Sequence, residues 1–181
     1  MKLKKLMIAL TFSFILISSP IVKAINVQYE TMGVPTNIST YWKTWMSYKA
    51  ITNKRSPQYK MLQRDWIYID SNGFLRAIGE KDLGISDDYY VIALGSYYGT
   101  TIGNKYKITT DTGNVFYGIL GDVKSNLHTD KTHRYTLNHN DMVEFLVNVP
   151  TLNKTVKKMG NANAYMPLNG NITKIEKINF Y

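Results

Sequence analysis

From residue 66 onward, hydrophobic and polar positions follow the short runs and alternation that are typical of β-strands. Residues 66–69 and 74–78 are rich in apolar residues and flank an Asp-Ser-Asn-Gly sequence, which predicts a β-hairpin. The same pattern predicts five further strands, at residues 89–98, 105–110, 115–120, 142–149 and 172–180. With only one helix expected, the chain predicts a mainly-β fold.

The part of the chain ahead of these strands has a different character. Residues 25–40 are polar and contain glycine and proline, so we expect a linker there. Residues 41–64 contain six basic residues and no acidic residue. Trp42, Trp45 and Met46 have helical spacing, which predicts a short amphipathic helix between Ser39 and Ile51. The two tryptophans either pack in the core or form an exposed aromatic surface for binding.

The first 24 residues are typical of a targeting signal. Lysines at positions 2, 4 and 5 precede an apolar run over residues 6–17, which is well short of the ~20 residues that span a bilayer. We therefore predict a signal peptide that is cleaved before Ile25, and a secreted or cell-wall-associated protein with no stable membrane anchor after cleavage. An uncleaved N-terminal anchor is the alternative.

Charge and composition narrow the classes of partner. The chain has 22 Lys and Arg against 13 Asp and Glu; removing the four lysines of the first 24 residues leaves 18 against 13, a net charge of +5. This charge is too small for a dedicated DNA-binding protein, so we expect no nucleic acid partner, but it suits a wall rich in anionic polymer. The chain has no cysteine, which excludes disulfides, thiolate zinc sites and a cysteine nucleophile.

Candidate chemistry is concentrated between residues 121 and 144. Asp122 ends an apolar strand, Asp130 follows in a polar loop, and Glu144 lies within the next apolar strand. The loop also contains the three histidines of the chain, His128, His133 and His139. On a half-apolar strand face Glu144 would be partly desolvated, which raises the pKa of a carboxyl group and suits a general acid. The alternative is that Glu144 lies at the rim and pairs with Lys or Arg.

Other kinds of catalytic site find little support. Histidine and aspartate are zinc ligands by type, but the spacing in the loop matches no HExxH motif. The chain has no GxSxG nucleophile motif and no phosphate-binding loop ending in GK[ST]. We therefore expect no metal and no cofactor, with a metal bound by the histidine-rich loop as the alternative.

Several segments resemble a known superfamily. They are residues 92–98, 102–108, 111–113, 116, 119–122 and 143–145. Their order is similar to that in the double-psi β-barrel superfamily, which includes three-aspartate domains, rare lipoprotein A, the barrel of membrane-bound lytic transglycosylase A, and expansins. The resemblance covers roughly residues 88–149, with 172–180 as the closing strand. It implies a six-stranded double-psi β-barrel over residues 88–181, preceded by a short N-terminal helix and an additional hairpin in residues 41–87.

The resemblance also implies a peptidoglycan lytic transglycosylase that uses carboxylate acid/base catalysis without a metal. Asp122 matches the position of the first acid, and either Asp130 or Glu144 would be its polar partner. We expect Asp122 to be held rigidly by its strand and Asp130 to lie in a solvated loop with a pKa near ~3.9. This chain departs from the family pattern because a longer, histidine-rich loop follows Asp122. The residues expected to bind the glycan are Tyr97, Tyr98, Lys124, His128, Thr129, His133 and Tyr135.

Two other functions compete with the enzyme. One is a non-catalytic, expansin-like module that binds peptidoglycan strands or an anionic wall polymer. The other is a surface interaction protein that holds a partner with the basic and aromatic residues 41–64. Fold alone does not choose between them, because one fold can carry both catalysis and binding.

Overall fold

The computed structural model describes residues 25–85 and 87–181. Residues 1–24 lie outside the described part of the chain. This includes the predicted signal peptide, which would be cleaved before Ile25, and the alternative N-terminal anchor. No helix in the described part of the chain is long and apolar enough to cross a membrane.

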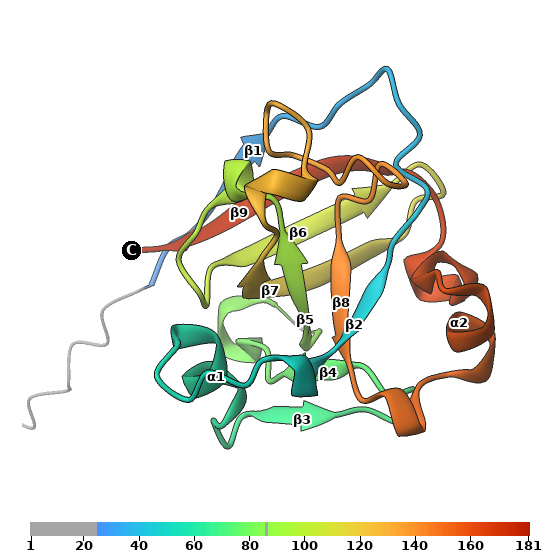
Figure 1. The fold of residues 1–181 in the computed structure, drawn as a ribbon. Coiled ribbons are helices and arrows are strands. Elements are labelled where there is room, and N and C mark those ends of the chain that lie inside the picture. Colours follow the sequence, from blue (N-terminus) through green and yellow to red (C-terminus); the bar gives the residue numbers. More distant parts are fainter. Residues whose placement is uncertain (1–24, 86) are drawn as a thin grey trace, which may run out of the picture.

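The fold is mainly β, as the sequence predicts, with nine strands in one mixed sheet (Figure 1). The strands are β1 (Val27–Met32), β2 (Trp45–Ser47), β3 (Ile67–Ile69), β4 (Leu75–Ala77), β5 (Tyr89–Leu94), β6 (Lys105–Thr110), β7 (Val115–Val123), β8 (Glu144–Val147) and β9 (Ile172–Phe180). Two six-residue helices, α1 (Pro57–Leu62) and α2 (Lys154–Met159), lie on opposite sides of the molecule in Figure 1.

The sheet is open. Its strands follow the order β1-β9-β6-β7-β5-β4-β3, with β8 paired to β5 and β2 paired to β8. Within the described residues no pairing joins β1 to β3, so the prediction of a closed six-stranded barrel is wrong. Strand β5 is the centre of the sheet, because it pairs with β7 in parallel and with β4 and β8 in antiparallel orientation.

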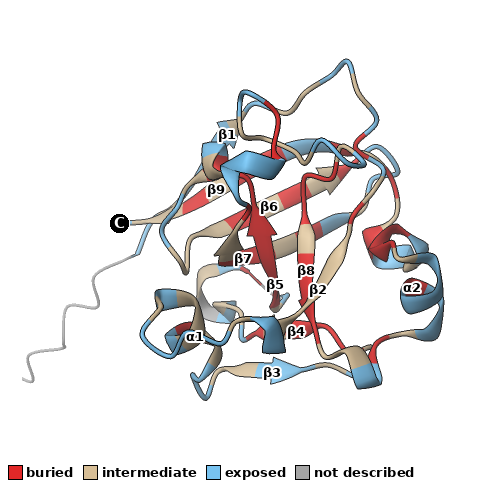
Figure 2. Cartoon of the chain, in the orientation of Figure 1, coloured by how far each residue is buried: buried red, intermediate tan, exposed pale blue. Residues whose placement is uncertain are grey.

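Both faces of β5 are buried, which explains why its sequence is continuously apolar rather than alternating (Figure 2). Tyr90, Ile92 and Leu94 belong to one core cluster, to which β6, β7, β8 and β9 also contribute. Tyr89, Val91 and Ala93 belong to a second cluster, which includes Met61 of α1. Strand β5 is therefore held from both sides by the core.

The predicted hairpin is confirmed. Strands β3 and β4 pair in antiparallel orientation, and Ile69 lies opposite Leu75. Asp70 shapes the turn between them, because its Oδ1 accepts hydrogen bonds from the backbone N–H of Asn72 (2.9 Å) and of Phe74 (3.0 Å). Gly73 has a φ of 81°, a conformation that glycine adopts without strain.

The N-terminal predictions are wrong in two places. Residues 45–47 form strand β2 instead of a helix, because they pair in parallel with β8, with Trp45 opposite Phe145. Residues 27–32 of the predicted linker form β1, which pairs with β9. Strands β2, β3 and β4, from residues 41–87, belong to the same sheet as the later strands.

The buried tyrosines predict that the fold is lost in alkali. Burial raises the pKa of Tyr90 and of Tyr106 to about 12. A pKa that is raised in the folded state contributes stability below pH ~10, and this contribution is lost as the pH rises toward 12. We expect unfolding in that window, measured by circular dichroism together with phenolate absorbance. Tyr90→Phe removes one such group and should move the alkaline midpoint upward; full ionisation of every tyrosine in a protein that stays folded would contradict the prediction.

Candidate functional site

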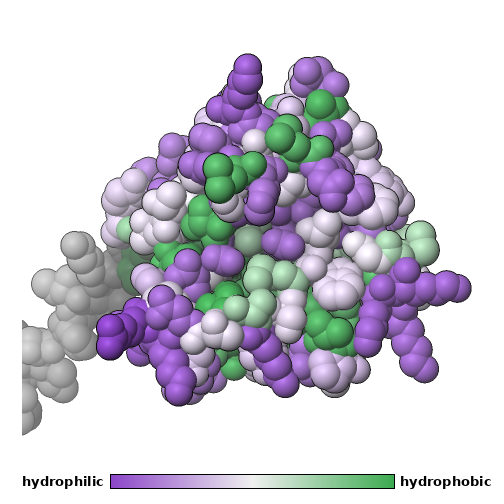
Figure 3. All heavy atoms as spheres, viewed as in Figure 1, coloured by the Kyte–Doolittle hydropathy of each residue, from purple (hydrophilic) through white to green (hydrophobic). Residues whose placement is uncertain are grey.

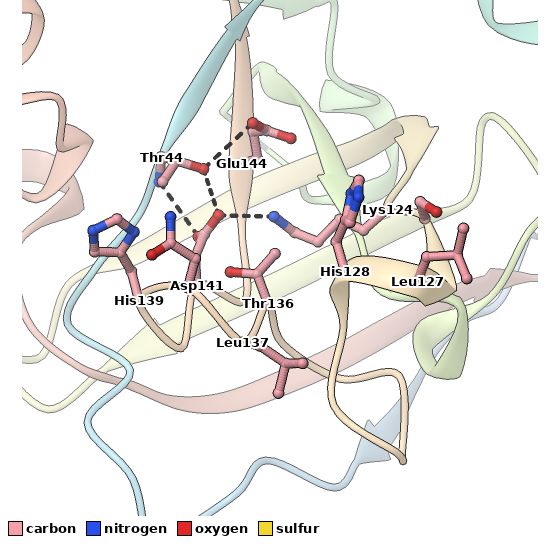
Figure 4. Close-up of a pocket in the computed structure, with 11 residues that line it drawn as sticks. Thr44, Lys124, Leu127, His128, Thr136, Leu137, His139, Asp141 and Glu144 are labelled. Atoms are coloured by element: carbon pink, nitrogen blue, oxygen red, sulfur yellow. Dashed lines mark hydrogen bonds and ion pairs between the residues drawn. The ribbon is translucent and has the colours of Figure 1, made fainter.

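A pocket of about 590 Å³ opens beside the ends of β7 and β8 (Figure 4). Its walls come from Thr44 ahead of β2, the residues after β7, the short 3₁₀-helix η4 (Asn126–His128), the loop before β8, and Glu144 at the start of β8. The lining residues are Thr44, Lys124, Ser125, Leu127, His128, Thr136, Leu137, Asn138, His139, Asp141 and Glu144.

A buried ion pair forms the floor of this pocket. The Nζ atom of Lys124 lies 2.8 Å from Oδ2 of Asp141, and the two side chains are only 3% and 1% exposed. Thr44 donates to the same carboxylate twice, through its backbone N–H (3.3 Å) and through its hydroxyl. Asp141 is therefore held by three donors, as a buried carboxylate requires.

Glu144 stands next to this ion pair and lines the pocket. Burial raises the pKa of its carboxyl group, the positive charge of Lys124 opposes that rise, and the negative charge of Asp141 adds to it. The hydroxyl of Thr44 lies 3.4 Å from Oε1 of Glu144. The raised pKa has the direction expected from the half-apolar strand. Lys124 forms its ion pair with Asp141 rather than with Glu144, and no ion pair of Glu144 with Lys or Arg is present among the described residues.

Asp122 lies on the same face of the sheet as Glu144. Ala93 of β5 pairs with Asp122 on one side and with Glu144 on the other, so the small alanine separates two carboxyl groups. Strands lie about 4.8 Å apart, which places the two backbones roughly 10 Å from each other. Asp122 does not line the pocket; its Oδ1 instead accepts a hydrogen bond from Gln58 of α1 (3.3 Å).

A β-bulge turns Asp122 toward this face. The register of β5 and β7 shifts between Ile92 and Ala93, which leaves Gly121 as the extra residue on β7. A Cβ atom on Gly121 would lie 2.3 Å from Cγ1 of Val91. Only glycine fits this bulge, and the bulge gives Asp122 the orientation that a regular strand would deny it.

The prediction of a solvated Asp130 is wrong. Asp130 is buried, and its carboxylate accepts hydrogen bonds from the backbone N–H groups of Thr132, Arg134 and Tyr135 and from the Thr132 hydroxyl. Burial by itself would raise its pKa, but the hydrogen bonds from Thr132 and from the backbone outweigh burial and lower the pKa to about 2. Asp130 therefore shapes its loop and does not line the pocket.

The three histidines do not converge. His128 is exposed and lines the pocket. The ring of His139 stacks on Trp42 at 4.7 Å, while Nδ1 of His133 lies 3.0 Å from the Thr129 hydroxyl. Over residues 25–85 and 87–181, no group of three His, Asp or Glu side chains is arranged to hold a metal ion.

The structure separates the other residues expected to bind a glycan. Tyr98 is fully buried and its hydroxyl donates to the Gly33 carbonyl (3.1 Å), so its ring cannot stack on a sugar and that prediction is wrong. Thr129 is buried as well, and Tyr135 packs against the core. Tyr97 is exposed, with the Arg134 guanidinium 4.1 Å from its ring centre. Of the seven predicted residues, the pocket is lined by Lys124 and His128.

Backbone strain marks the loop over the pocket. His133, His139 and Asn140 have φ values of 56°, 148° and 54°, and they are the non-glycine residues with positive φ in the described chain. Such conformations are costly and tend to cluster at functional sites.

Hydrophobic side chains also reach the surface in the upper half of Figure 3, and two residues of the pocket, Leu127 and Leu137, are 88% and 68% exposed.

Sequence reasoning missed Thr44 and Asp141. Asp141 directly precedes the mostly apolar run that contains Glu144, which mirrors the position of Asp122 at the end of an apolar run, and that symmetry was a usable signal. Thr44 has no such signal, because it reaches the site only through the pairing of β2 with β8. Comparison of the chain with family models, curated proteins and solved structures finds no match, so its function is argued from the site itself.

Proposed function

We propose that this protein is a secreted, cell-wall-directed enzyme that cleaves peptidoglycan strands by carboxylate acid/base catalysis, with Glu144 as the acid/base. The observation that carries the proposal is the placement of Glu144 at the start of a core strand, where it lines the pocket beside an acid, Asp141, that is already paired with Lys124; burial raises the pKa of Glu144 in the direction that a general acid needs. The sequence resemblance of residues 88–149 to the double-psi superfamily suggests the same reaction class, although the sheet here is open. The assignment moves the catalytic role from Asp122 to Glu144.

The reaction balances on one carboxyl group. Protonated Glu144 gives its proton to the glycosidic oxygen as the bond from that oxygen to the sugar C1 breaks. Its carboxylate then takes the proton of the C6 hydroxyl while O6 bonds to C1, which closes a 1,6-anhydro ring and restores the protonated acid. Asp122 lies across Ala93 on the same face of the sheet but outside the pocket lining, so it takes no direct part in either proton transfer.

The walls of the pocket suit a sugar. The ring face of His139 is stacked on Trp42, and the exposed side chains of Leu127 and Leu137 add apolar surface. Sugars present apolar ring faces and polar edges, and a pocket of this kind pairs apolar walls with a few fixed polar groups. The Thr44 hydroxyl and the Glu144 carboxyl group are two of the polar groups in this pocket.

One observation favours a non-catalytic, expansin-like wall-binding module as the second candidate. Asp122, the second carboxylate, points to Gln58 of α1 and lies outside the pocket lining. A module that only binds glycan strands needs the groove but no second carboxylate in it.

The deciding experiment incubates the protein, purified from Ile25 onward, with murein sacculi. We expect soluble fragments with anhydro ends, detected by mass spectrometry, because the proposed reaction uses no water. Fragments with reducing ends would reject the transglycosylase step and leave a hydrolase. Binding to sacculi without release would support the expansin-like module, and neither binding nor release would reject both functions.

A further inference from the structure

A second, chemically different surface surrounds α1. Its five basic side chains are all exposed, and the segment that carries them contains no acidic residue. They are Lys49, Lys54, Arg55, Lys60 and Arg64. None of them takes part in an ion pair within the described chain. Strongly hydrophilic side chains project around α1 at the lower left of Figure 3. This charge is therefore available to a partner.

The basic surface contains a pocket of about 380 Å³. Tyr48, Ile51, Tyr59 and Leu62 supply its apolar walls, and Lys49 and Lys54 also line it. The walls have a fixed shape, because the Ser56 hydroxyl caps α1 by accepting from the Tyr59 backbone N–H (3.1 Å).

Helix α1 is also tied to the core through Met61, which is 7% exposed. A pocket with half-buried tyrosine walls and two exposed ammonium groups fits a compact polar ring or polyol next to an anionic group. Such units repeat along anionic glycopolymers.

We propose that this pocket, which we call the α1 pocket, binds an anionic glycopolymer, with a sugar or polyol unit between Tyr48 and Tyr59 and a phosphodiester or carboxylate group on Lys49 and Lys54. This inference goes beyond glycan cleavage and does not depend on Glu144. Single-stranded nucleic acid fits less well, because it stacks successive bases on a row of exposed aromatic side chains, whereas the α1 pocket is a single hollow of about 380 Å³.

The α1 pocket also lies next to the catalytic face. Gln58, on the same short helix, contacts Asp122 of β7. A polymer bound at the α1 pocket would hold the enzyme on the wall close to the strands that it cleaves, so the two sites would act on different polymers of one structure.

The test measures binding of poly(glycerol phosphate), polygalacturonate and single-stranded DNA by titration calorimetry at two salt concentrations. We expect binding of at least one of the two glycopolymers, and the stronger of the two identifies the anionic group. Lys49→Gln/Lys54→Gln should weaken that binding by at least about tenfold, because it removes two charge-assisted contacts. The matched control is Lys154→Gln/Lys158→Gln, which removes two exposed lysines from α2 on the opposite side of the molecule and should leave binding unchanged.

Each failure has a distinct meaning. An equal loss in both double variants would overturn the proposal in favour of general charge attraction, and tighter binding of DNA would overturn it in favour of a nucleic acid site. Binding of neither glycopolymer would also overturn it. Cleavage of purified sacculi that carry no anionic polymer should be the same in the Lys49→Gln/Lys54→Gln variant and the parent protein, so loss of the α1 pocket and loss of catalysis are separable.

Discussion

Replacing Glu144 with glutamine is expected to reduce glycan release by about 100- to 10,000-fold, the usual contribution of a general acid and base. Glutamine keeps the size and hydrogen-bonding capacity of the side chain but cannot donate a proton to the glycosidic oxygen. Thermal unfolding of Glu144→Gln should stay close to that of the parent protein, because the side chain forms no ion pair within the described chain. The measurement is the rate of fragment release from sacculi.

The pH profile tests the same assignment. Burial raises the pKa of Glu144, so the protonated acid persists to a higher pH than an ordinary glutamate would allow. Activity should therefore be retained at low pH and decline as the pH rises through that elevated pKa.

Asp122→Asn is the informative comparison for this prediction. Because Asp122 lies outside the pocket lining, we expect Asp122→Asn to reduce glycan release less than Glu144→Gln does. Loss of activity in Asp122→Asn together with full activity in Glu144→Gln would return the catalytic role to Asp122.

Replacing Lys124 with methionine should destabilise the protein by about 3–5 kcal/mol, the usual effect of removing one member of a buried ion pair. Methionine fills most of the space of the lysine stem but leaves the carboxylate of Asp141, which is 1% exposed, without its cation. Urea unfolding at neutral pH measures the free energy of unfolding directly.

The double variant Lys124→Met/Asp141→Leu separates the ion pair from packing. With both charges removed, most of the lost stability should return, because apolar replacements of a buried pair are often neutral. A double variant as unstable as the sum of the two single variants would show that the side chains stabilise the fold independently. Lys174→Met is the surface control, since Lys174 pairs with Glu176 with 46% of its side chain exposed and should change stability by less than about 1 kcal/mol.

Sequence predicts a strand well when packing on the core produces a regular pattern of apolar and polar positions, or when a turn sequence marks the end of the strand. Strand β6 alternates because one of its faces packs on the core, and the β3–β4 hairpin carries its own turn sequence. Strands β1 and β2 escaped prediction because they are mostly half-buried or exposed. Their strand conformation is imposed by partners far along the chain, which local propensity does not register.

The candidate site was likewise predictable from sequence only where the local pattern reveals the environment of a residue. Glu144 was recognisable as an acid in an apolar strand, and its raised pKa follows from that placement. Asp130 was misjudged because its sequence neighbours are polar, whereas its environment consists of backbone N–H groups that point inward. The contact of Thr44 with Asp141 joins residues nearly 100 positions apart, and no local pattern encodes it.

The position of β9 between β1 and β6 has a consequence for how the chain folds. The register that joins Val27 to Phe180 requires the two ends of the described chain to meet, and the pairing of Trp45 with Phe145 closes a second long loop. Closing such long loops lowers the conformational entropy of the chain before the native strand pairings form to compensate for that loss. A topology of this kind therefore folds in milliseconds to seconds rather than in microseconds. Until β9 docks, β1 lacks the one strand that it pairs with in the described chain, and one edge of β6 stays open to other chains, so the intermediate without β9 in place is the species most prone to aggregate.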